Sequence, residues 1–580
     1  MNLWHWLKIS HRMIWLEYSL LSLAVLLPLL LPGYIFTLDM IFVPRLPMPS
    51  APENTYILQA FLHYINYFIP SQIIQKFLLF LILVLSGVGM HCLVQKGNKL
   101  QNPSSLAVKS RSKPPVSDRQ PTIWGAYLAG VFYMINPFTY TRFMAGHYLL
   151  LLGYALLPFF VAGLFSFLEK PNLKSATRLS AWTLAISIVS IHMVGFTVLL
   201  SAAAAMTALI RHRRSGRQLA AIIKYGLVAL GIVIIASAYW LVPYAAGQTP
   251  SAQLVSQFDS RDTAFFQTVG DKRLGLALNS AALYGFWGDN KGIYSLPKAQ
   301  MPIWPIILLV LFILMFTGAK SSWRRDRSVT AVLLVSGLMA IILSLGSAYG
   351  PLVPINNWLN TYLPFFKGYR EPQKFVAVAA LAEAYFLGMG LSSLLKIAKT
   401  RKFRTWKLEG MGVIFLLLPI LYTPTMLWGF SGQVKASNYP ADWYSLNDKL
   451  NQDKDNYQVL FLPWHQYMKF QFAGRVIANP ADIFFDKPVI QGDNAEFGEV
   501  YRSVSNPVTE GIENSVLRPA NRLSNAGEIL ASYQVKYIIV AKEVDWRDYN
   551  FLDKQADIKL ISESEHLKVY QNIAYNAGKI

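Results

Sequence analysis

Cysteine and charged residues are both scarce in this sequence, and each scarcity excludes a class of protein. The 580 residues include a single cysteine, Cys92, so a disulfide framework is excluded. Charged residues make up 15% of the chain and hydrophobic residues 53%. A soluble globular protein carries about 25% charged residues. The composition therefore indicates a chain whose main solvent is lipid.

The sequence also lacks the motifs GxGxxG, GK[ST], HExxH and CxxC, which mark several common enzyme sites. The net charge of +21 would suit a nucleic-acid-binding protein, but its placement argues otherwise. From Phe430 onward, 16 Lys and Arg face 19 Asp and Glu, a net of −3. The basic excess thus lies among the apolar segments, where it sets membrane orientation. We expect no nucleic-acid partner.

Apolar runs predict about eleven transmembrane helices, since a bilayer core of about 30 Å needs roughly 20 helical residues. The predicted spans are 14–36, 73–94, 121–138, 148–168, 177–193, 195–210, 225–246, 302–319, 329–346, 374–395 and 409–429. The spans 177–193 and 195–210 could instead form one long helix. Both flanking segments are basic, which favours a hairpin that turns near His192–Gly195.

The distribution of basic residues fixes the predicted orientation. The segments assigned to the cytoplasm (1–13, 95–120, 169–176, 211–224, 320–328 and 396–408) hold 25 Lys and Arg in 83 residues. The segments assigned outside (37–72, 139–147, 247–301 and 347–373) hold 9 in 127. We expect a cytoplasmic N-terminus, a solvated linker at 95–120 and an outer C-terminal domain. The cysteine-free outer domain favours the plasma membrane of a prokaryote.

Two outer segments and the tail complete the predicted architecture: a membrane domain at 1–429 and a small α/β extracytoplasmic domain at 430–580. Residues 54–69 are amphipathic and too short to span, so we expect interfacial helices there. Loop 247–301 is long and aromatic. In the tail, "YQVLFLPW" and "VKYIIVAK" are strand-like, "GEILASY" is helical and "IKLISESEHLKVYQN" predicts a hairpin.

Ionisable residues near membrane depth are costly and are therefore candidate functional residues. Asp39 follows the first span, and the alternative is an acid that ends a helix in the headgroup layer. Arg142 and His147 lie between the third and fourth spans, where a snorkelling cation and an interfacial histidine are the alternative. His192 lies at the expected hairpin, where a hydrogen-bonded turn residue is the simpler interpretation.

The segment "FFKGYREPQKF" places Lys367, Arg370, Glu371 and Lys374 at the outer end of the tenth span. Basic residues are usually depleted on the outer side of a membrane, and three of them within eight positions there are an exception to this rule. Such a cluster suggests an anionic partner such as a lipid phosphate. The alternative is an internal network of Arg–Glu pairs.

This arrangement resembles the GT-C membrane glycosyltransferases. The segments "PGYIFTLDMIFVPRLP", "GAYLAGVFYMINPFTYTRFMAGHY" and "FKGYREPQKF" are similar to the membrane cores of the arabinofuranosyltransferase D and YfhO-like branches, over roughly residues 1–430. Two departures matter. Asp39 has no close acidic partner, Glu53 being the nearest, and the carbohydrate-binding modules of the arabinofuranosyltransferase are absent, so its sugar and acceptor do not transfer.

The resemblance implies transfer of a sugar from a polyprenyl-phosphate donor to an acceptor glycan, glycolipid or glycoprotein at the outer membrane face. It implies Asp39 as the base and Arg370 and Lys374 as phosphate contacts. Glu53, Arg142, His147, His192 and Glu371 are secondary candidates. A divalent cation, Mg²⁺ or Mn²⁺, is the one cofactor left open. A non-enzymatic transporter or scaffold for lipid-linked glycans is the alternative function, although no internal repeat supports a transporter.

The predicted orientation can be tested with single cysteines at Ser110 and Ser524 in a Cys92→Ser background. An impermeant maleimide applied to intact cells should label position 524 and leave position 110 unlabelled, because the basic segments lie inside. Labelling of position 110 without position 524 contradicts the orientation.

Overall fold

The computed structural model describes residues 10–99, 116–213, 215–363, 365–493, 495–497, 500–502 and 506–576. Most of the predicted linker at 95–120 lies outside the described residues. The chain forms two compact units. The first contains residues 1–27, 49–61 and 77–433, and the second contains residues 28–48, 62–76 and 434–580. The predicted domains were contiguous in sequence, and the observed units are not.

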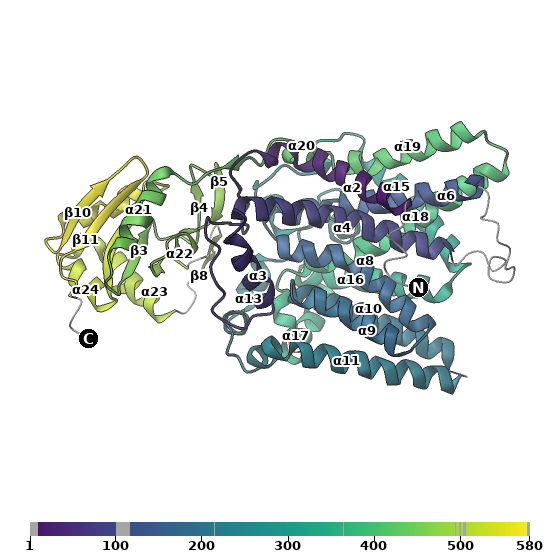
Figure 1. The fold of residues 1–580 in the computed structure, drawn as a ribbon, viewed down its shortest axis with the longest axis horizontal. Coiled ribbons are helices and arrows are strands. Elements are labelled where there is room, and N and C mark those ends of the chain that lie inside the picture. The colour runs from purple at the N-terminus through teal and green to yellow at the C-terminus, as the bar shows by residue number, and fades with distance from the viewer. Residues whose placement is uncertain are drawn as a thin grey trace. The chain divides into compact units, whose positions relative to one another are not determined.

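Helices dominate the first unit (Figure 1), and one is found at the position of each predicted span. They are α2 (Ser10–Leu26), α4 (Ser71–Lys99), α6 (Val116–Met134), α8 (Tyr148–Glu169), α9 (Leu173–Ser187), α10 (Ile191–His212), α11 (Gly216–Ala245), α15 (Trp304–Trp323), α16 (Arg327–Leu345), α18 (Val376–Thr400) and α19 (Thr405–Tyr422). Nine helical segments of the described residues are long and apolar enough to cross a membrane. Neither α6 nor the 15-residue α9 is among them.

Several predicted boundaries differ from the observed ones, and two of them lie near candidate site residues. The first span was expected to reach Phe36, but α2 ends at Leu26, and only a 3₁₀ turn (Leu27–Leu30) follows. Proline lacks the donor that would continue the helix, and Pro28 and Pro32 lie in this stretch. The hairpin turn lies before His192, because Ser190 caps α10 by accepting a hydrogen bond from the Met193 backbone nitrogen. His192 is therefore a helical residue.

Shorter helices join the long ones. They are α3 (Tyr56–Asn66), α7 (Pro137–Met144), α12 (Pro250–Ser256), α13 (Ser260–Phe265), α14 (Gly275–Ala281), α17 (Val353–Tyr362) and α20 (Leu427–Ser431), with 3₁₀ turns at Trp287–Asn290, Pro297–Ala299, Gly346–Ala348, Gly350–Leu352, Phe366–Tyr369, Pro372–Phe375 and Pro424–Met426. Helix α3 confirms the helix predicted within 54–69. Its exposed face carries Ile57, Phe61 and Tyr64.

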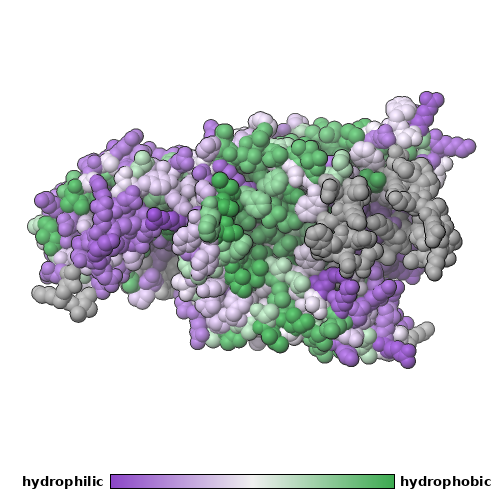
Figure 2. Space-filling view, in the orientation of Figure 1, coloured by the Kyte–Doolittle hydropathy of each residue, from purple (hydrophilic) through white to green (hydrophobic). Residues whose placement is uncertain are grey.

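The helical unit is built around α18, most of whose residues from Val376 to Ser392 are buried. Helix α11 is the contrasting case, because large apolar residues such as Leu227 and Ile235 are exposed along it. Apolar residues cover much of the visible surface of the helical part (Figure 2). Outward-facing apolar side chains on long helices are what a lipid environment requires.

A mixed five-stranded sheet organises the second unit, in the order β10-β11-β9-β3-β6. Strands β3 and β6 pair in parallel, as do β3 and β9, whereas β11 is antiparallel to both β9 and β10. The strands are β3 (Gln458–Leu462), β6 (Val489–Ile490), β9 (Val535–Ala541), β10 (Ile558–Glu563) and β11 (Leu567–Asn572). Helix α24 (Ala526–Ser532) precedes β9. The predicted strands, helix and hairpin are confirmed.

Smaller elements complete the second unit. They are β1 (Tyr34–Ile35), β2 (Ala436–Ser437), β4 (Tyr467–Phe470), β5 (Arg475–Ala478), β7 (Ala495–Phe497), β8 (Val500–Arg502), α21 (Ala441–Gln452), α22 (Ala481–Phe484), α23 (Pro507–Ile512), a π-helical turn (Glu513–Leu517), and 3₁₀ turns at Ala520–Arg522 and Trp546–Lys554. Strand β1 pairs antiparallel with β2, so the segment after the first helix is part of this unit. Gly33 precedes it at φ +113°, where a Cβ would lie 2.8 Å from the Ser437 carbonyl oxygen.

Glycines bring α15 and α18 into backbone contact, which gives a direct test of the packing. A Cβ on Gly318 would lie 1.8 Å from the Phe386 carbonyl oxygen, and one on Gly390 would lie 2.1 Å from that of Leu314. Gly318→Ala should therefore lower the melting temperature of the purified protein, since the helices must separate. In the control Gly231→Ala, on α11, a Cβ meets nothing within 4 Å. The melting temperature of that variant should equal or exceed that of the parent, because alanine has a higher helix propensity than glycine by up to about 1 kcal/mol. Equal melting temperatures for both variants contradict this packing.

Candidate functional site

Helix α7 holds Arg142 inside the first unit. Asn136 caps α7 by accepting a hydrogen bond from the Thr139 backbone nitrogen, and Pro137 occupies the first helical position. The Asn136 amide also donates to the Tyr154 hydroxyl at 3.1 Å, which ties the cap to α8. All eight residues of α7 are buried. The Arg142 guanidinium is consequently fixed, with 0% of its side chain exposed.

Arg142 joins the two segments that the sequence predicted to cap the third and tenth spans. Its Nη1 donates to Glu371 Oε2 at 2.6 Å and lies 3.2 Å from His147 Nδ1. Its Nη2 donates to the Gln373 side-chain oxygen. Guanidinium has only donors, so the contact with His147 requires an unprotonated Nδ1. Glu371 thus forms an internal pair of the kind that the alternative interpretation of the cluster describes, although its partner is Arg142 of another segment.

Lys374 extends the network toward α10. Its ammonium lies 3.6 Å from Glu371 Oε1 and 3.2 Å from His192 Nε2. His192 Nε2 also lies 3.0 Å from the Gly368 carbonyl oxygen. A single ring nitrogen either accepts from Lys374 or donates to Gly368, so the two contacts are alternatives. The Tyr369 hydroxyl donates to the His192 carbonyl oxygen at 2.7 Å, which holds the turn before Arg370 against α10.

The network controls the charge of Glu371. Burial by itself would raise the pKa of Glu371, but the charges of Lys374 and Arg142 outweigh burial and hold it well below the usual range. A carboxylate with such a low pKa is a weak base. Two buried donors, Arg142 Nε and Gln373 Nε2, find no hydrogen-bond partner among the described residues. Glu371 is thus suited to holding Arg142, and not to accepting a proton from a substrate.

Arg370 and Lys367 face a separate cavity of about 230 Å³ in the first unit. The Arg370 guanidinium lies 4.0 Å and 4.3 Å from the ring centres of Phe258 and Phe266, and its Nη1 lies 3.5 Å from Asp262 Oδ1. Lys367 is exposed, and no acidic side chain of the described residues pairs with it. The cavity therefore has a positively charged wall.

Amide and hydroxyl side chains form much of the rest of the cavity, beside apolar side chains and one carboxylate, that of Asp259, which pairs with Arg261. Asn356, Asn357 and Asn360 come from α17, and Thr263 comes from α13 in the long loop 247–301. Such side chains both donate and accept hydrogen bonds, as sugar hydroxyls do. Sequence reasoning missed them. The available signal was Asn360, which lies four residues after Asn356 and three after Asn357 in a short helix beside the basic cluster, since both spacings make side chains neighbours on a helix surface.

The other two predicted acids, Asp39 and Glu53, belong to different units. Asp39 belongs to the second unit, where it is exposed in a tight turn between Thr37 and Met40 and accepts a hydrogen bond from the Tyr467 hydroxyl at 2.8 Å. Glu53 belongs to the first unit and accepts from the Ser251 backbone nitrogen at 2.9 Å, at the start of α12. Both acids therefore accept a hydrogen bond, Glu53 from a backbone nitrogen and Asp39 from a tyrosine hydroxyl.

A divalent cation such as Mg²⁺ or Mn²⁺ would be held by carboxylate or histidine side chains. In the described parts of the chain, no three or more His, Cys, Asp or Glu side chains come together as metal ligands would. Glu371 is engaged by guanidinium and ammonium groups, Glu53 by a backbone nitrogen and Asp39 by a tyrosine hydroxyl. The Mg²⁺ or Mn²⁺ ion that the sequence left open stays a prediction, and no step below depends on a metal.

The fold of this chain is similar to that of a solved GT-C glycosyltransferase, which agrees with the resemblance seen in the sequence. The structures it resembles are those of arabinofuranosyltransferase AftD from Mycobacteria. The structure of AftD matches with a TM-score of 0.62 and 13% identity, over 97% of this chain and 40% of AftD. The structure of a mutant form of AftD matches with a TM-score of 0.63 and 13% identity, over 98% of this chain and 42% of AftD. The chain thus spans about two fifths of AftD, and the likeness shows the fold. No family model and no curated protein matches the sequence.

The buried ion pair makes a prediction about stability. Glu371→Gln leaves the Arg142 charge buried without a counterion, which should cost about 3–5 kcal/mol. Because the pKa of Glu371 is lowered in the folded state, its contribution is present above pH about 4.3 and is lost as pH falls below that value. The thermal stability of purified protein at neutral pH measures the effect.

The matched control is Arg261→Gln, which breaks the pair with Asp259 at 3.0 Å, where 79% of the Arg261 side chain is exposed. An exposed pair contributes about 0–1 kcal/mol, so this variant should unfold near the parental temperature. Equal losses in the two variants would show that the Arg142–Glu371 pair is not the stronger constraint.

Proposed function

We propose that this protein is a membrane glycosyltransferase that takes its sugar from a polyprenyl-phosphate donor at the outer face of the membrane. The observation that carries the proposal is the cavity with Lys367 and Arg370 on its wall, in a chain with the fold of AftD over 98% of its length. AftD is an arabinofuranosyltransferase. The sugar and acceptor of this chain are left open.

The chemistry of the cavity suits a sugar phosphate. A planar guanidinium matches the geometry of phosphate oxygens, and the Lys367 ammonium supplies a second charge. Phe258 and Phe266 lie against the Arg370 guanidinium, which restricts its motion and partly excludes water. The asparagine amides of α17 would then hold sugar hydroxyls. Binding the departing phosphate in this way stabilises the negative charge that develops as the sugar leaves.

Activation of the acceptor needs a base, and Asp39 is our candidate. Its carboxylate is exposed and oriented by the Tyr467 hydroxyl, whereas Glu371 is neutralised by Arg142 and Glu53 caps a backbone nitrogen. An acceptor hydroxyl would give its proton to Asp39 as its oxygen bonds to the sugar carbon. The bond from that carbon to the donor phosphate breaks, and polyprenyl phosphate leaves with the electron pair.

The proposed activity can be tested with purified protein and radiolabelled polyprenyl-phosphate sugars that differ in the sugar. For at least one donor, a transferase releases polyprenyl phosphate and transfers the labelled sugar to an acceptor. When no acceptor is present, it transfers the sugar to water. A transporter or scaffold leaves every donor intact while retaining affinity for it. Intact donors throughout the series, with binding preserved, would therefore favour the non-enzymatic alternative.

The cationic wall predicts how donor binding responds to substitution. Arg370→Ala and Lys367→Ala should each raise the KM for the donor about tenfold or more, because a charge-assisted contact contributes about 1.5–3 kcal/mol. Arg370→Lys should also be impaired, since it loses the bidentate geometry. The control Lys272→Ala removes an exposed lysine of the same outer loop and should leave KM unchanged.

Lys374→Ala separates the two roles of the basic cluster. Lys374 is buried between Glu371 and His192, so its loss should lower the melting temperature more than it changes the KM. An unchanged donor KM in both Arg370 variants and in Lys367→Ala would place the phosphate site elsewhere.

The candidate base gives the sharpest kinetic prediction. Asp39→Asn keeps the size and the hydrogen bond from Tyr467 but removes the basicity, so kcat should fall about 10²–10⁴-fold at unchanged melting temperature. Asp39→Glu should be partly active at best, because a displacement of roughly 1 Å can cost about 10²-fold. Turnover of Asp39→Asn at the parental rate, with a donor that the parent uses, rules out Asp39 as the base.

A further inference from the structure

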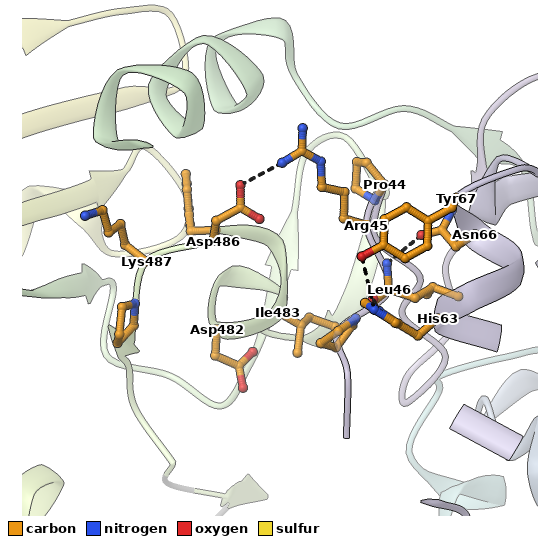
Figure 3. A pocket seen from close by; sticks show the side chains of 13 residues that line it. Pro44, Arg45, Leu46, His63, Asn66, Tyr67, Asp482, Ile483, Asp486 and Lys487 are labelled. Atoms are coloured by element: carbon orange, nitrogen blue, oxygen red, sulfur yellow. Dashed lines mark hydrogen bonds and ion pairs between the residues drawn. The ribbon is translucent and has the colours of Figure 1, made fainter. Parts of the chain in front are cut away.

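The second unit contains a groove of about 640 Å³ that the proposed function does not yet use. One wall is the segment 44–47, and the other is the segment 482–488 that begins in α22 (Figure 3). His63, Asn66 and Tyr67 lie on the side of the first wall. The volume is within the range of about 300–1,000 Å³ that is typical of small-molecule sites.

The groove is balanced in charge. Arg45 and Lys487 contribute two cations, and Asp482 and Asp486 contribute two carboxylates. Arg45 pairs with Asp486 at 3.2 Å, and the Lys487 ammonium donates to the Asp453 carbonyl oxygen at 2.8 Å. Neither sign is in excess, so the groove is a poor match for a phosphate or an isolated cation. It differs in this from the cationic cavity of the first unit, and it favours a neutral polar ligand.

An aromatic side chain beside carboxylates narrows the class of ligand. Tyr67 is 73% exposed and borders the groove, and Asp482 is exposed on the other wall. A sugar ring has an apolar C–H face that packs on an aromatic ring, and hydroxyls that donate to carboxylates. Proline and isoleucine supply further apolar surface at Pro44 and Ile483. The combination matches a carbohydrate more closely than a purely apolar or purely ionic ligand.

Hydrogen bonds hold the first wall in place before any ligand binds. The Leu46 backbone nitrogen donates to the Asn66 side-chain oxygen at 2.7 Å, and the Leu46 carbonyl lies 2.6 Å from His63 Nδ1. A carbonyl only accepts, so Nδ1 carries the proton and Nε2 is left to accept from the Tyr67 hydroxyl, 3.4 Å away. The wall and the aromatic ring are therefore positioned together, which lowers the entropic cost of binding.

We propose that this groove binds a neutral oligosaccharide, and that this oligosaccharide is the acceptor glycan of the transferase. Its identity as the acceptor rests on the proposed function, whereas the binding itself does not. Tyr67 packs against a sugar ring, and Asp482 accepts hydrogen bonds from hydroxyls. Asp486 is held by Arg45 and by Asn447 and Asn451, so it shapes the wall.

Equilibrium binding to the full-length protein in detergent tests the groove without any donor. The probes are fluorescein-labelled neutral oligosaccharides of arabinofuranose, mannose and glucose, an anionic oligogalacturonate and inorganic phosphate. At least one neutral probe should bind, and Tyr67→Ala should weaken it about tenfold or more, as for a buried aromatic contact. Tyr67→Phe keeps the ring and should retain most of the affinity. Asp482→Ala should also weaken binding, at unchanged melting temperature.

The control Tyr362→Ala removes a tyrosine on α17 of the first unit, of which 69% is exposed, and should bind as the parent does. The proposal is overturned if no neutral probe binds, if oligogalacturonate or phosphate binds as well as the best neutral probe, or if both Tyr67→Ala and Asp482→Ala bind normally. Because no donor is present, a protein that fails to transfer sugar can still pass this test. Failure of the groove and failure of the transferase are therefore distinguishable.

Discussion

The first unit depends on a single buried guanidinium. Arg142 is removed from water, and a charge in such surroundings needs a counterion and hydrogen-bond acceptors to be tolerated. Glu371, Gln373 and His147 provide them. The pair joins α7 to the start of α18, although 229 residues separate Arg142 from Glu371 in the sequence. Arg370 immediately precedes Glu371, so the same contact fixes the turn that brings Arg370 to the cavity.

The segment FKGYREPQKF consequently divides its charges between two tasks. Glu371 and Lys374 face inward, to Arg142 and His192, and stabilise the fold. Lys367 and Arg370 border the cavity, where the packed rings of Phe258 and Phe266 hold the guanidinium. The sequence offered an internal network and an anion site as alternatives. The internal network describes Glu371 and Lys374, and the anion site that we propose describes Lys367 and Arg370. The charge-balanced groove of the second unit suits the other reactant, a neutral sugar.

Much of the fold could be predicted, because apolar runs and basic flanks report directly on membrane helices. Each predicted span coincides with a helix, and the strands at Gln458–Leu462 and Val535–Ala541 were predicted from continuous apolar runs. The contacts between residues far apart in the sequence could not be predicted. Nothing local shows that β1 would pair with β2 some 400 residues later, or that Lys374 would turn inward while Arg370 does not. Such choices depend on which partner each charge meets after folding.

The proposed function requires that Arg370 and Lys367 bind the phosphate of the donor. The most direct measurement is an experimental structure of the protein in lipid nanodiscs with polyprenyl phosphate, the product common to every donor of this class. The account predicts phosphate density within hydrogen-bond distance of the Arg370 guanidinium and the Lys367 ammonium. Phosphate density bound elsewhere, with the cavity between α13 and α17 occupied only by water, would contradict it.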